Sequence, residues 1–294
     1  MTDLHRSTWS PLERLEEDAA DVARYALAED GPEDLTSELT VPGGLRGTGR
    51  LEFRNPGVLA GTRYADAVAH EAGFGPVRWS AADGDRLAGG TITGTLEGPM
   101  RAILLGERTL LNLLQRASGI ATGTRAFVDA VAHTRCRVLH TRKTAPGLRL
   151  FDVSAVVAGG GHLHRLDLAH QLMVKDNHWR ALRQSGVRLA DVMLHAEGRD
   201  AAGLYVEVES EAQLREACSA GAGRLLVDNQ SPATVRAWAV LARELRPGIE
   251  IEATGGITLA NVAAYAEAGA DFVSIGALTH SVQAADISLE VEGR

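Results

Sequence analysis

Hydrophobic residues recur at helical spacing near the start of the chain. Leu15, Ala19 and Val22 lie three or four residues apart, so in a helix they share one face. The preceding Ser10-Pro11-Leu12-Glu13 offers a hydroxyl cap, a proline in the first turn and a glutamate that can complete the cap. The pattern predicts a helix that runs to about Leu27, followed by a polar loop over 29–37.

Short alternating runs replace the helical pattern between about residues 46 and 105. In 49–54, for example, polar and apolar residues follow one another as they do in a half-buried strand. Turn sequences such as Asn55-Pro56-Gly57 separate these runs. We expect a small α+β domain with an antiparallel sheet, and then a long helix from Glu107 towards Ala132.

Six short apolar runs follow in the second half of the chain, and their starts are roughly 20 to 36 residues apart. Each interval leaves room for a loop and one helix. Near-continuous apolar strands that alternate with helices are typical of a parallel sheet covered by helices. We therefore predict an α/β fold with an incomplete (β/α) barrel, and keep an open doubly wound sheet as the alternative. The runs are Cys136–His140, Leu172–Val174, Leu204–Val208, Arg224–Val227, Ile249–Ala253 and Asp271–Ile275.

The composition of this 294-residue chain excludes some classes of binding partner, because its formal net charge is −8. Nucleic-acid binding needs a cationic face, so an acidic chain argues against it. Cys136 and Cys218 show neither metal-ligand spacing nor a disulfide framework, which fits a reducing compartment. No run approaches the roughly 20 apolar residues of a membrane helix, and the first residues lack the apolar core of a signal peptide. We expect a cytoplasmic protein with no membrane partner.

Polar residues stand at the carboxyl end of each predicted strand. In parallel α/β folds these ends face the ligand. Polar residues also follow strands into ordinary loops, but their repetition on every strand favours a binding site. They are Thr141, Arg142 and Lys143 after the first run, Lys175 after the second, Glu207 in the third and Asp228 after the fourth.

The last two strands end in small residues. Thr254-Gly255-Gly256 follows the fifth run, and Ser274-Ile275-Gly276 closes the sixth. At such strand-to-helix turns, free backbone N–H groups can surround an anion. In (β/α) barrels a phosphate commonly binds at the loops of the final two strands. We interpret the two turns as a cradle for a monophosphate.

A dense set of basic residues accompanies this cradle, although the chain as a whole is acidic. Such a local reversal of charge concentrates an anionic ligand in a cleft. Arginines match carboxylates with paired N–H groups, whereas lysines act on phosphates as point charges. The basic residues are Arg142, Lys143, His164, Arg165 and Lys175.

Glu207 and Asp228 are the acidic counterpart of the basic set. Their carboxylates could accept hydrogen bonds from ribose hydroxyls, or hold Mg²⁺ against a pyrophosphate, directly or through water or substrate. They could equally serve to neutralise Lys143 and Lys175. Both roles are compatible with the same geometry.

Eight motifs occur in an order that resembles the quinolinate phosphoribosyltransferase family, also called nicotinate-nucleotide pyrophosphorylase (carboxylating). The resemblance covers nearly the whole chain. The motifs are Glu107–Thr122, Thr141–Gly147, His164-Arg165, Lys175–His178, Glu207–Glu209, Asp228-Asn229, Thr254–Ile257 and Gly276–His280.

The resemblance implies a type II phosphoribosyltransferase architecture. It places an N-terminal α/β sandwich domain at 1–118 and an α/β barrel catalytic domain at 119–280, with a C-terminal tail, 281–294, that packs back on the first domain. It further implies a homodimer or an assembly of dimers, in which the N-terminal domain of one subunit caps the barrel of the other.

Roles follow from the resemblance residue by residue. Arg108 reaches a substrate carboxylate from the neighbouring subunit. Quinolinate carboxylates are bound by Arg142, His164 and Arg165 with help from Thr141, and Lys143 and Lys175 contact carboxylate or phosphoribosyl pyrophosphate. Glu207 and Asp228 face the ribose hydroxyls and the metal, and the 5-phosphate is held by Thr254, Gly255, Gly256 and Gly276.

The implied reaction gives nicotinate mononucleotide, pyrophosphate and CO₂, with Mg²⁺ and without an organic cofactor. The chain departs from the family pattern at Glu33, His140 and Leu163, which puts substrate fine-tuning in question rather than the reaction type. Two alternatives remain open: a paralogous phosphoribosyltransferase for another aromatic carboxylate, and a non-catalytic phosphate-binding barrel protein.

Overall fold

A computed structural model describes residues 14–31, 33–169, 171–195 and 203–293. The predicted helix cap at Ser10–Glu13 therefore lies outside the described residues. The described chain forms two compact units. One contains Ala126–Arg142 and His162–Gly276, and we call it the barrel unit. The other contains 14–125, Lys143–Gly161 and 277–293, and we call it the sandwich unit.

The sandwich unit is built on an antiparallel sheet, as predicted. Its strand order is β12-β1-β5-β3, so the last strand of the chain pairs with the first. Residues in β1 alternate in burial: Leu51 and Phe53 are buried, whereas Arg50 is exposed. The strands are β1 (Arg46–Phe53), β3 (Arg78–Trp79), β5 (Thr91–Pro99) and β12 (Ile287–Gly293), and a separate two-stranded sheet joins β2 (Gly57–Val58) to β4 (Arg86–Leu87).

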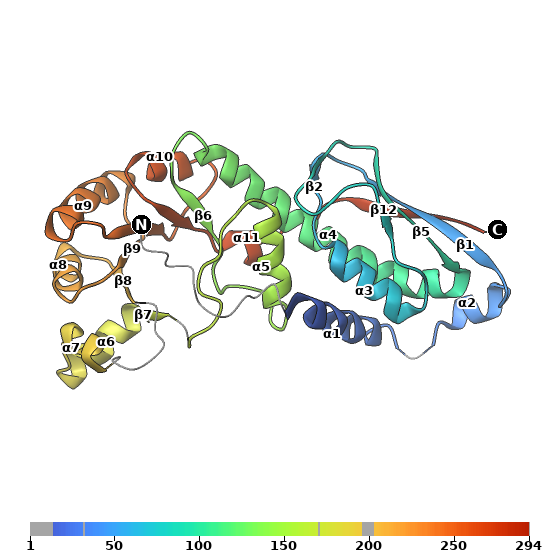
Figure 1. Cartoon of the computed structure of the whole chain (residues 1–294), viewed down its shortest axis with the longest axis horizontal. Coiled ribbons are helices and arrows are strands. Elements are labelled where there is room, and N and C mark those ends of the chain that lie inside the picture. Colours follow the sequence, from blue (N-terminus) through green and yellow to red (C-terminus); the bar gives the residue numbers. More distant parts are fainter. Residues whose placement is uncertain (1–13, 32, 170, 196–202, 294) are drawn as a thin grey trace. The chain divides into compact units, whose positions relative to one another are not determined.

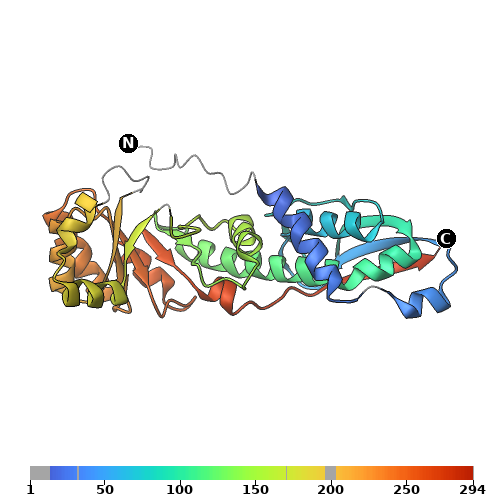
Figure 2. The same cartoon turned by 90° about the horizontal axis from the view of Figure 1, so that it is seen from below.

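Helices cover one face of this antiparallel sheet, with α3 and α4 against it (Figures 1 and 2). Two boundaries differ from the prediction. Helix α4 begins at Met100, ahead of the predicted Glu107, and a short helix occupies part of the predicted loop 29–37. The helices are α1 (Leu15–Ala28), α2 (Leu35–Thr40), α3 (Thr62–Ala72), α4 (Met100–Val131), α5 (Arg149–Ala158) and α11 (Ala277–His280).

The barrel unit contains a six-stranded sheet in the order β6-β11-β10-β9-β8-β7, and every neighbouring pair is parallel. All six predicted runs form its strands. They are β6 (Arg137–Leu139), β7 (Leu172–Val174), β8 (Leu204–Val208), β9 (Arg224–Asp228), β10 (Glu250–Thr254) and β11 (Phe272–Ser274).

Helices connect these strands and form a row in which α7 contacts α8, α8 contacts α9, and α9 contacts α10. Figure 1 shows α8, α9 and α10 following one another along the sheet. Strand residues such as Val206, Leu225 and Ile251 are completely buried, which explains their continuous apolar sequence. The predicted α/β fold with an incomplete barrel is confirmed. The connecting helices are α6 (Asp176–Ser185), α7 (Leu189–His195), α8 (Glu211–Ser219), α9 (Pro232–Leu245) and α10 (Val262–Glu267).

No helix within the described ranges is both long enough and apolar enough to span a membrane.

Candidate active site

The strand ends of the barrel unit carry the predicted site residues at one edge of the sheet. Asp228 ends β9 directly opposite Thr254, which ends β10. Glu207 lies one residue before the end of β8, and Lys175 follows β7. In a parallel sheet these carboxyl ends point the same way, so the side chains share one edge.

Two half-buried arginines of the barrel unit lie close enough for their charges to interact. Burial lowers the pKa of the Arg165 guanidinium, and the positive charge of Arg142 lowers it further, while Asp167 opposes the shift only in part. The Nε of Arg142 is buried and forms no hydrogen bond with the described residues. A repelling pair of guanidiniums with an unused donor is an arrangement that a bound anion stabilises.

His164 lies beside the arginines, but its ring faces protein groups. Its Nδ1 accepts a hydrogen bond of 2.7 Å from the Arg165 backbone N–H, and its Nε2 lies 3.3 Å from Glu252 Oε1. The side chain is only 8% exposed. His140, the residue that departs from the family pattern, is buried and approaches the carbonyl oxygens of Thr141 and His164 with its two ring nitrogens, each at 3.1 Å.

A lysine and acidic side chains form the next part of the edge. Lys175 Nζ pairs with Glu207 Oε2 at 2.8 Å, and the Asp176 N–H approaches Glu207 Oε1 at 3.4 Å. Burial raises the pKa of Asp228, and the negative charges of Glu207 and Glu209 raise it further, against the opposing effect of Lys175. Asp228 therefore carries its charge at a cost that a nearby cation or hydroxyl donor would reduce.

The glycine turn after β10 packs closely against Asp228 and Asn229. Gly255 and Gly256 both have left-handed backbones, with φ of 78° and 61°. A Cβ on Gly255 would stand 2.6 Å from Asn229 Cγ and 2.9 Å from Asp228 Oδ1, whereas a Cβ on Gly256 would meet open space. Asn229 itself has a positive φ, and its amide donates to Asp228 Oδ2 at 2.6 Å. The turn and the carboxylate thus depend on one another.

These two glycines give a matched pair of variants. Gly255→Ala is expected to lower kcat/KM by about 100-fold, because the new methyl displaces Asn229 and Asp228 from the site. Gly256→Ala adds the same methyl at a similar φ but without the collision, so its effect should be at least tenfold smaller, on the scale of backbone strain alone. Steady-state kinetics with phosphoribosyl pyrophosphate varied measures both. Equal losses in the two variants would refute the steric link.

Ser274 and Gly276 stand at the end of β11, where the second half of the phosphate cradle is predicted. Ser274 is buried, and its hydroxyl helps to lower the pKa of Glu252. The serine side chain is therefore used by the sheet interior. The role of Gly276 in phosphate binding stays a prediction.

Lys143 and Arg108 belong to the sandwich unit. The backbone carbonyl of Lys143 accepts a hydrogen bond of 2.9 Å from the Thr279 hydroxyl. Arg108 is an exposed residue of α4 and forms no hydrogen bond or ion pair within the part of the chain that the structure describes. The roles of both residues toward substrate stay predictions.

Sequence reasoning missed two buried ion-pair systems. In the barrel unit, Arg224 pairs with Glu250 and Glu252. In the sandwich unit, Asp152 is completely buried and accepts both a fork from Arg116, at 3.0 Å per bond, and the Ala145 N–H at 2.9 Å. In the sequence, Asp152 is a charged residue inside an otherwise apolar run, which indicates a buried charge. Its partners become clear only from the structure.

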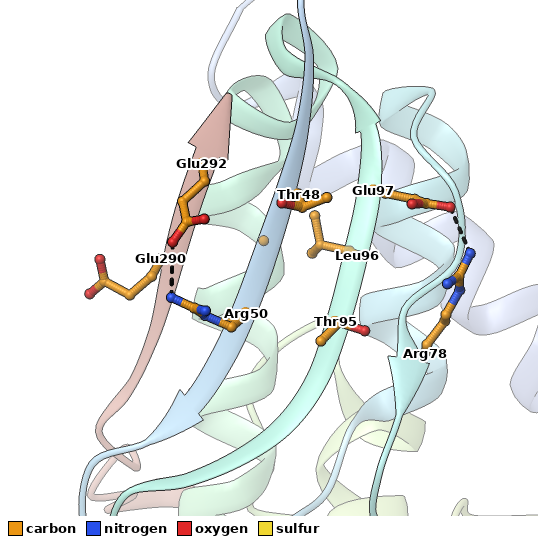
Figure 3. A pocket seen from close by; sticks show the side chains of 9 residues that line it. Thr48, Arg50, Arg78, Thr95, Leu96, Glu97, Glu290 and Glu292 are labelled. Carbon is orange, nitrogen blue, oxygen red and sulfur yellow. Dashed lines mark hydrogen bonds and ion pairs between the residues drawn. The ribbon is translucent and has the colours of Figure 1, made fainter. Parts of the chain in front are cut away.

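A hollow of about 300 Å³ lies elsewhere, on the sheet of the sandwich unit. Figure 3 shows its charged side chains on the face turned away from the helices, with Arg50 paired to Glu292 at 3.0 Å and Arg78 to Glu97 at 2.6 Å. These charged side chains already pair with one another and are exposed to water. The hollow therefore leaves few charged groups available to bind a ligand. It is not the candidate active site.

The barrel edge defines the class of protein. An incomplete (β/α) barrel that gathers unneutralised guanidiniums, a lysine–carboxylate cluster and a left-handed glycine turn at its strand ends is built to bind phosphorylated, carboxylated small molecules. The family model for the C-terminal domain of quinolinate phosphoribosyl transferase matches residues 120–290, and the model for its N-terminal domain matches 34–118. The chain belongs to the quinolinate phosphoribosyltransferase family.

Individual relatives agree with this assignment. The chain is 38% identical over 278 residues to the probable nicotinate-nucleotide pyrophosphorylase [carboxylating] of Methanothermobacter thermautotrophicus, covering 93% of this chain and 99% of the relative. It is 41% identical over 285 residues to the Mycobacterium leprae nicotinate-nucleotide pyrophosphorylase [carboxylating], covering 93% and 97%. The solved structure of the nicotinate-nucleotide pyrophosphorylase from Francisella tularensis superposes with a TM-score of 0.84 at 29% identity, covering 94% and 97%.

Proposed function

We propose that the chain transfers the phosphoribosyl group of phosphoribosyl pyrophosphate to quinolinate with loss of CO₂, which yields nicotinate mononucleotide and pyrophosphate. This reaction is a step of NAD biosynthesis. The names of the relatives and the family models support it. The structural observation that carries it is the pair of mutually repelling arginines, Arg142 and Arg165, with a buried, unused donor. A planar dicarboxylate supplies two negative groups to such a pair.

The chemistry requires two things of the site. The bond from ribose C1 to pyrophosphate breaks with its electron pair on the leaving oxygen, and the pyridine nitrogen lone pair forms the new bond to C1. Positive side chains stabilise the departing anion, and the arginines orient the ring nitrogen toward C1. The alkylated, cationic ring then accepts the electron pair of the C2–carboxylate bond as CO₂ leaves, and C2 takes up a proton.

Mg²⁺ fits this site as an ion that arrives with the diphosphate. Among the described residues no cluster of three or more metal-ligating side chains exists, so no ready-made cage is present. Magnesium commonly binds through one or two carboxylates plus substrate phosphates. The repulsion that raises the pKa of Asp228 next to Glu207 and Glu209 is what a cation would relieve. Glu207 and Asp228 are the residues that we propose to lie on the metal side, where the ion would neutralise pyrophosphate charge.

A homodimer or assembly of dimers, in which Arg108 reaches the partner's site, is also proposed. Its support is the exposure of Arg108 and its lack of an intramolecular partner in the described chain. The cytoplasmic location stays a prediction from the sequence.

One assay tests the proposed function. Protein, Mg²⁺, phosphoribosyl pyrophosphate and quinolinate are mixed, and nicotinate mononucleotide and CO₂ are followed. We expect product with quinolinate and, at equal concentration, at least 100-fold less with nicotinic acid, because it lacks the second carboxylate that a paired guanidinium binds. If nicotinic acid reacts as well as quinolinate, the two-carboxylate clamp is wrong.

A further inference from the structure

A carboxylate with no part in the proposed reaction lies inside the barrel unit, beside His164. Glu252 of β10 is completely buried, and its Oε2 accepts a hydrogen bond of 3.1 Å from Arg224. Arg224 is held in turn by Glu250, at 2.8 Å, and by the aromatic rings of Tyr205 and Phe272. Burial by itself raises the pKa of Glu252, but His164, the Arg224 guanidinium and Ser274 together lower it below its ordinary value. Glu252 is therefore ionised at neutral pH.

The second oxygen of this carboxylate, Oε1, lies near His164. Oε1 lies 3.3 Å from His164 Nε2 and is buried without a well-formed hydrogen bond to the described residues. The separation of the two atoms is within hydrogen-bonding range, and His164 Nε2 is a possible donor to this oxygen. The carboxylate accepts only, so the proton of the imidazole belongs on Nε2.

The tautomer of His164 determines what its other nitrogen can do. With the proton on Nε2, Nδ1 carries a lone pair and accepts the Arg165 N–H at 2.7 Å. The backbone carbonyl of His164 is held as well, because its oxygen lies 3.1 Å from His140 Nε2. The backbone that leads into Arg165 is thus fixed from both sides by imidazole rings.

We propose that Glu252 is a positioning residue for the dicarboxylate substrate: held by Arg224, it keeps His164 in the Nε2–H tautomer, and His164 in turn fixes the backbone of Arg165. This inference rests on the proposed function for the identity of the anion. It gives His164 a part in binding that acts through the backbone of Arg165.

Glu252→Gln tests the chain of hydrogen bonds with almost no change in volume. Arg224 only donates, so the new amide turns its oxygen to Arg224 and its NH₂ group to His164. His164 must then accept at Nε2 and carry its proton on Nδ1, where it meets the Arg165 N–H and breaks that bond. We expect KM for quinolinate to rise about 10- to 100-fold, with kcat and the KM for phosphoribosyl pyrophosphate changed less than about threefold.

Glu250→Gln is the matched control. This variant also replaces a carboxylate that pairs with Arg224 by an amide, since Glu250 Oε2 lies 2.7 Å from an Arg224 nitrogen. Unlike Glu252, Glu250 does not pair with His164. Its quinolinate KM should stay within about twofold of the wild type. Equal effects of both variants on KM, or a loss of kcat for Glu252→Gln with its quinolinate KM unchanged, would reduce Glu252 to a structural partner of Arg224 and overturn the proposal.

A measurement on the unaltered protein keeps the test decisive if Glu252→Gln does not fold. Nitrogen-15 NMR of histidine-labelled protein, with His164 assigned by its absence in His164→Asn, reports which ring nitrogen carries the proton. We expect Nε2–H in the free protein; an Nδ1–H or doubly protonated ring refutes the proposal. An inactive wild type with the expected tautomer would instead count against the proposed function alone.

Discussion

Arg142→Ala is expected to lower kcat/KM for quinolinate by about 1,000-fold or more, since it removes one side of a charge-assisted clamp and leaves a substrate carboxylate unpaired. The guanidinium of Arg142 is half-buried, its Nε has no partner in the described chain, and its charge acts on Arg165. Initial rates with quinolinate varied give the loss, and near-normal activity would exclude Arg142 from the site.

The same variant should not weaken the free protein. Because the charge of Arg142 depresses the pKa of Arg165, removing it relieves a repulsion, and Tm without ligand should be unchanged or slightly higher. Arg224→Ala is the contrasting control: it leaves Glu252 buried without its cation, which costs about 3–5 kcal/mol of unfolding free energy. If Arg142→Ala melts as early as Arg224→Ala, Arg142 is a structural residue.

The fold could be predicted because its elements carry their patterns locally. Each strand of the parallel sheet is a short buried run, and its helix follows within the same interval of sequence. Helix α2 was missed because its apolar residues, Leu35 and Leu39, are exposed and so show no buried face. The start of α4 was placed too late because residues 100–105 were assigned to the region of alternating runs; within this helix, Gly106 allows the ring of Phe74 to pack closely.

The candidate site could be predicted only in part. The position of residues at strand ends follows from the topology, and this identified Lys175, Glu207 and Asp228. The direction of a side chain inside the barrel does not follow from spacing. Glu252 stands two residues before Thr254, on a strand that also carries Glu250, and nothing in the sequence connects it to His164.

The unusual residue at 140 illustrates the same limit. The sequence shows that His140 departs from the family pattern, but only the coordinates show that it is buried between two backbone carbonyls. Its ring supports the peptides that carry Thr141 and His164, so this departure acts on the backbone of two predicted site residues.

Lys175→Met is expected to lower kcat by about 100- to 1,000-fold, because it removes a positive charge that is available to the departing pyrophosphate. It should also move the acid limb of the pH–rate profile upward. Lys175 lowers the pKa of Asp228 against burial and the charge of Glu207, so its loss lets that pKa rise. As pH falls, Asp228 then becomes protonated and loses its charge at a higher pH than in the wild type.

The raised pKa of Asp228 should also make the stability of the folded variant depend on pH. A carboxyl group whose folded-state pKa is raised favours folding at low pH, and that contribution is lost as pH rises through the raised value. Lys175→Met should therefore lose more Tm, relative to the wild type, at neutral pH than at about pH 4, close to the ordinary pKa of an aspartate. Lys175→Arg keeps the charge beside Glu207 and should retain the wild-type acid limb. An acid limb that is the same in the methionine variant and the wild type would show that Lys175 does not control Asp228.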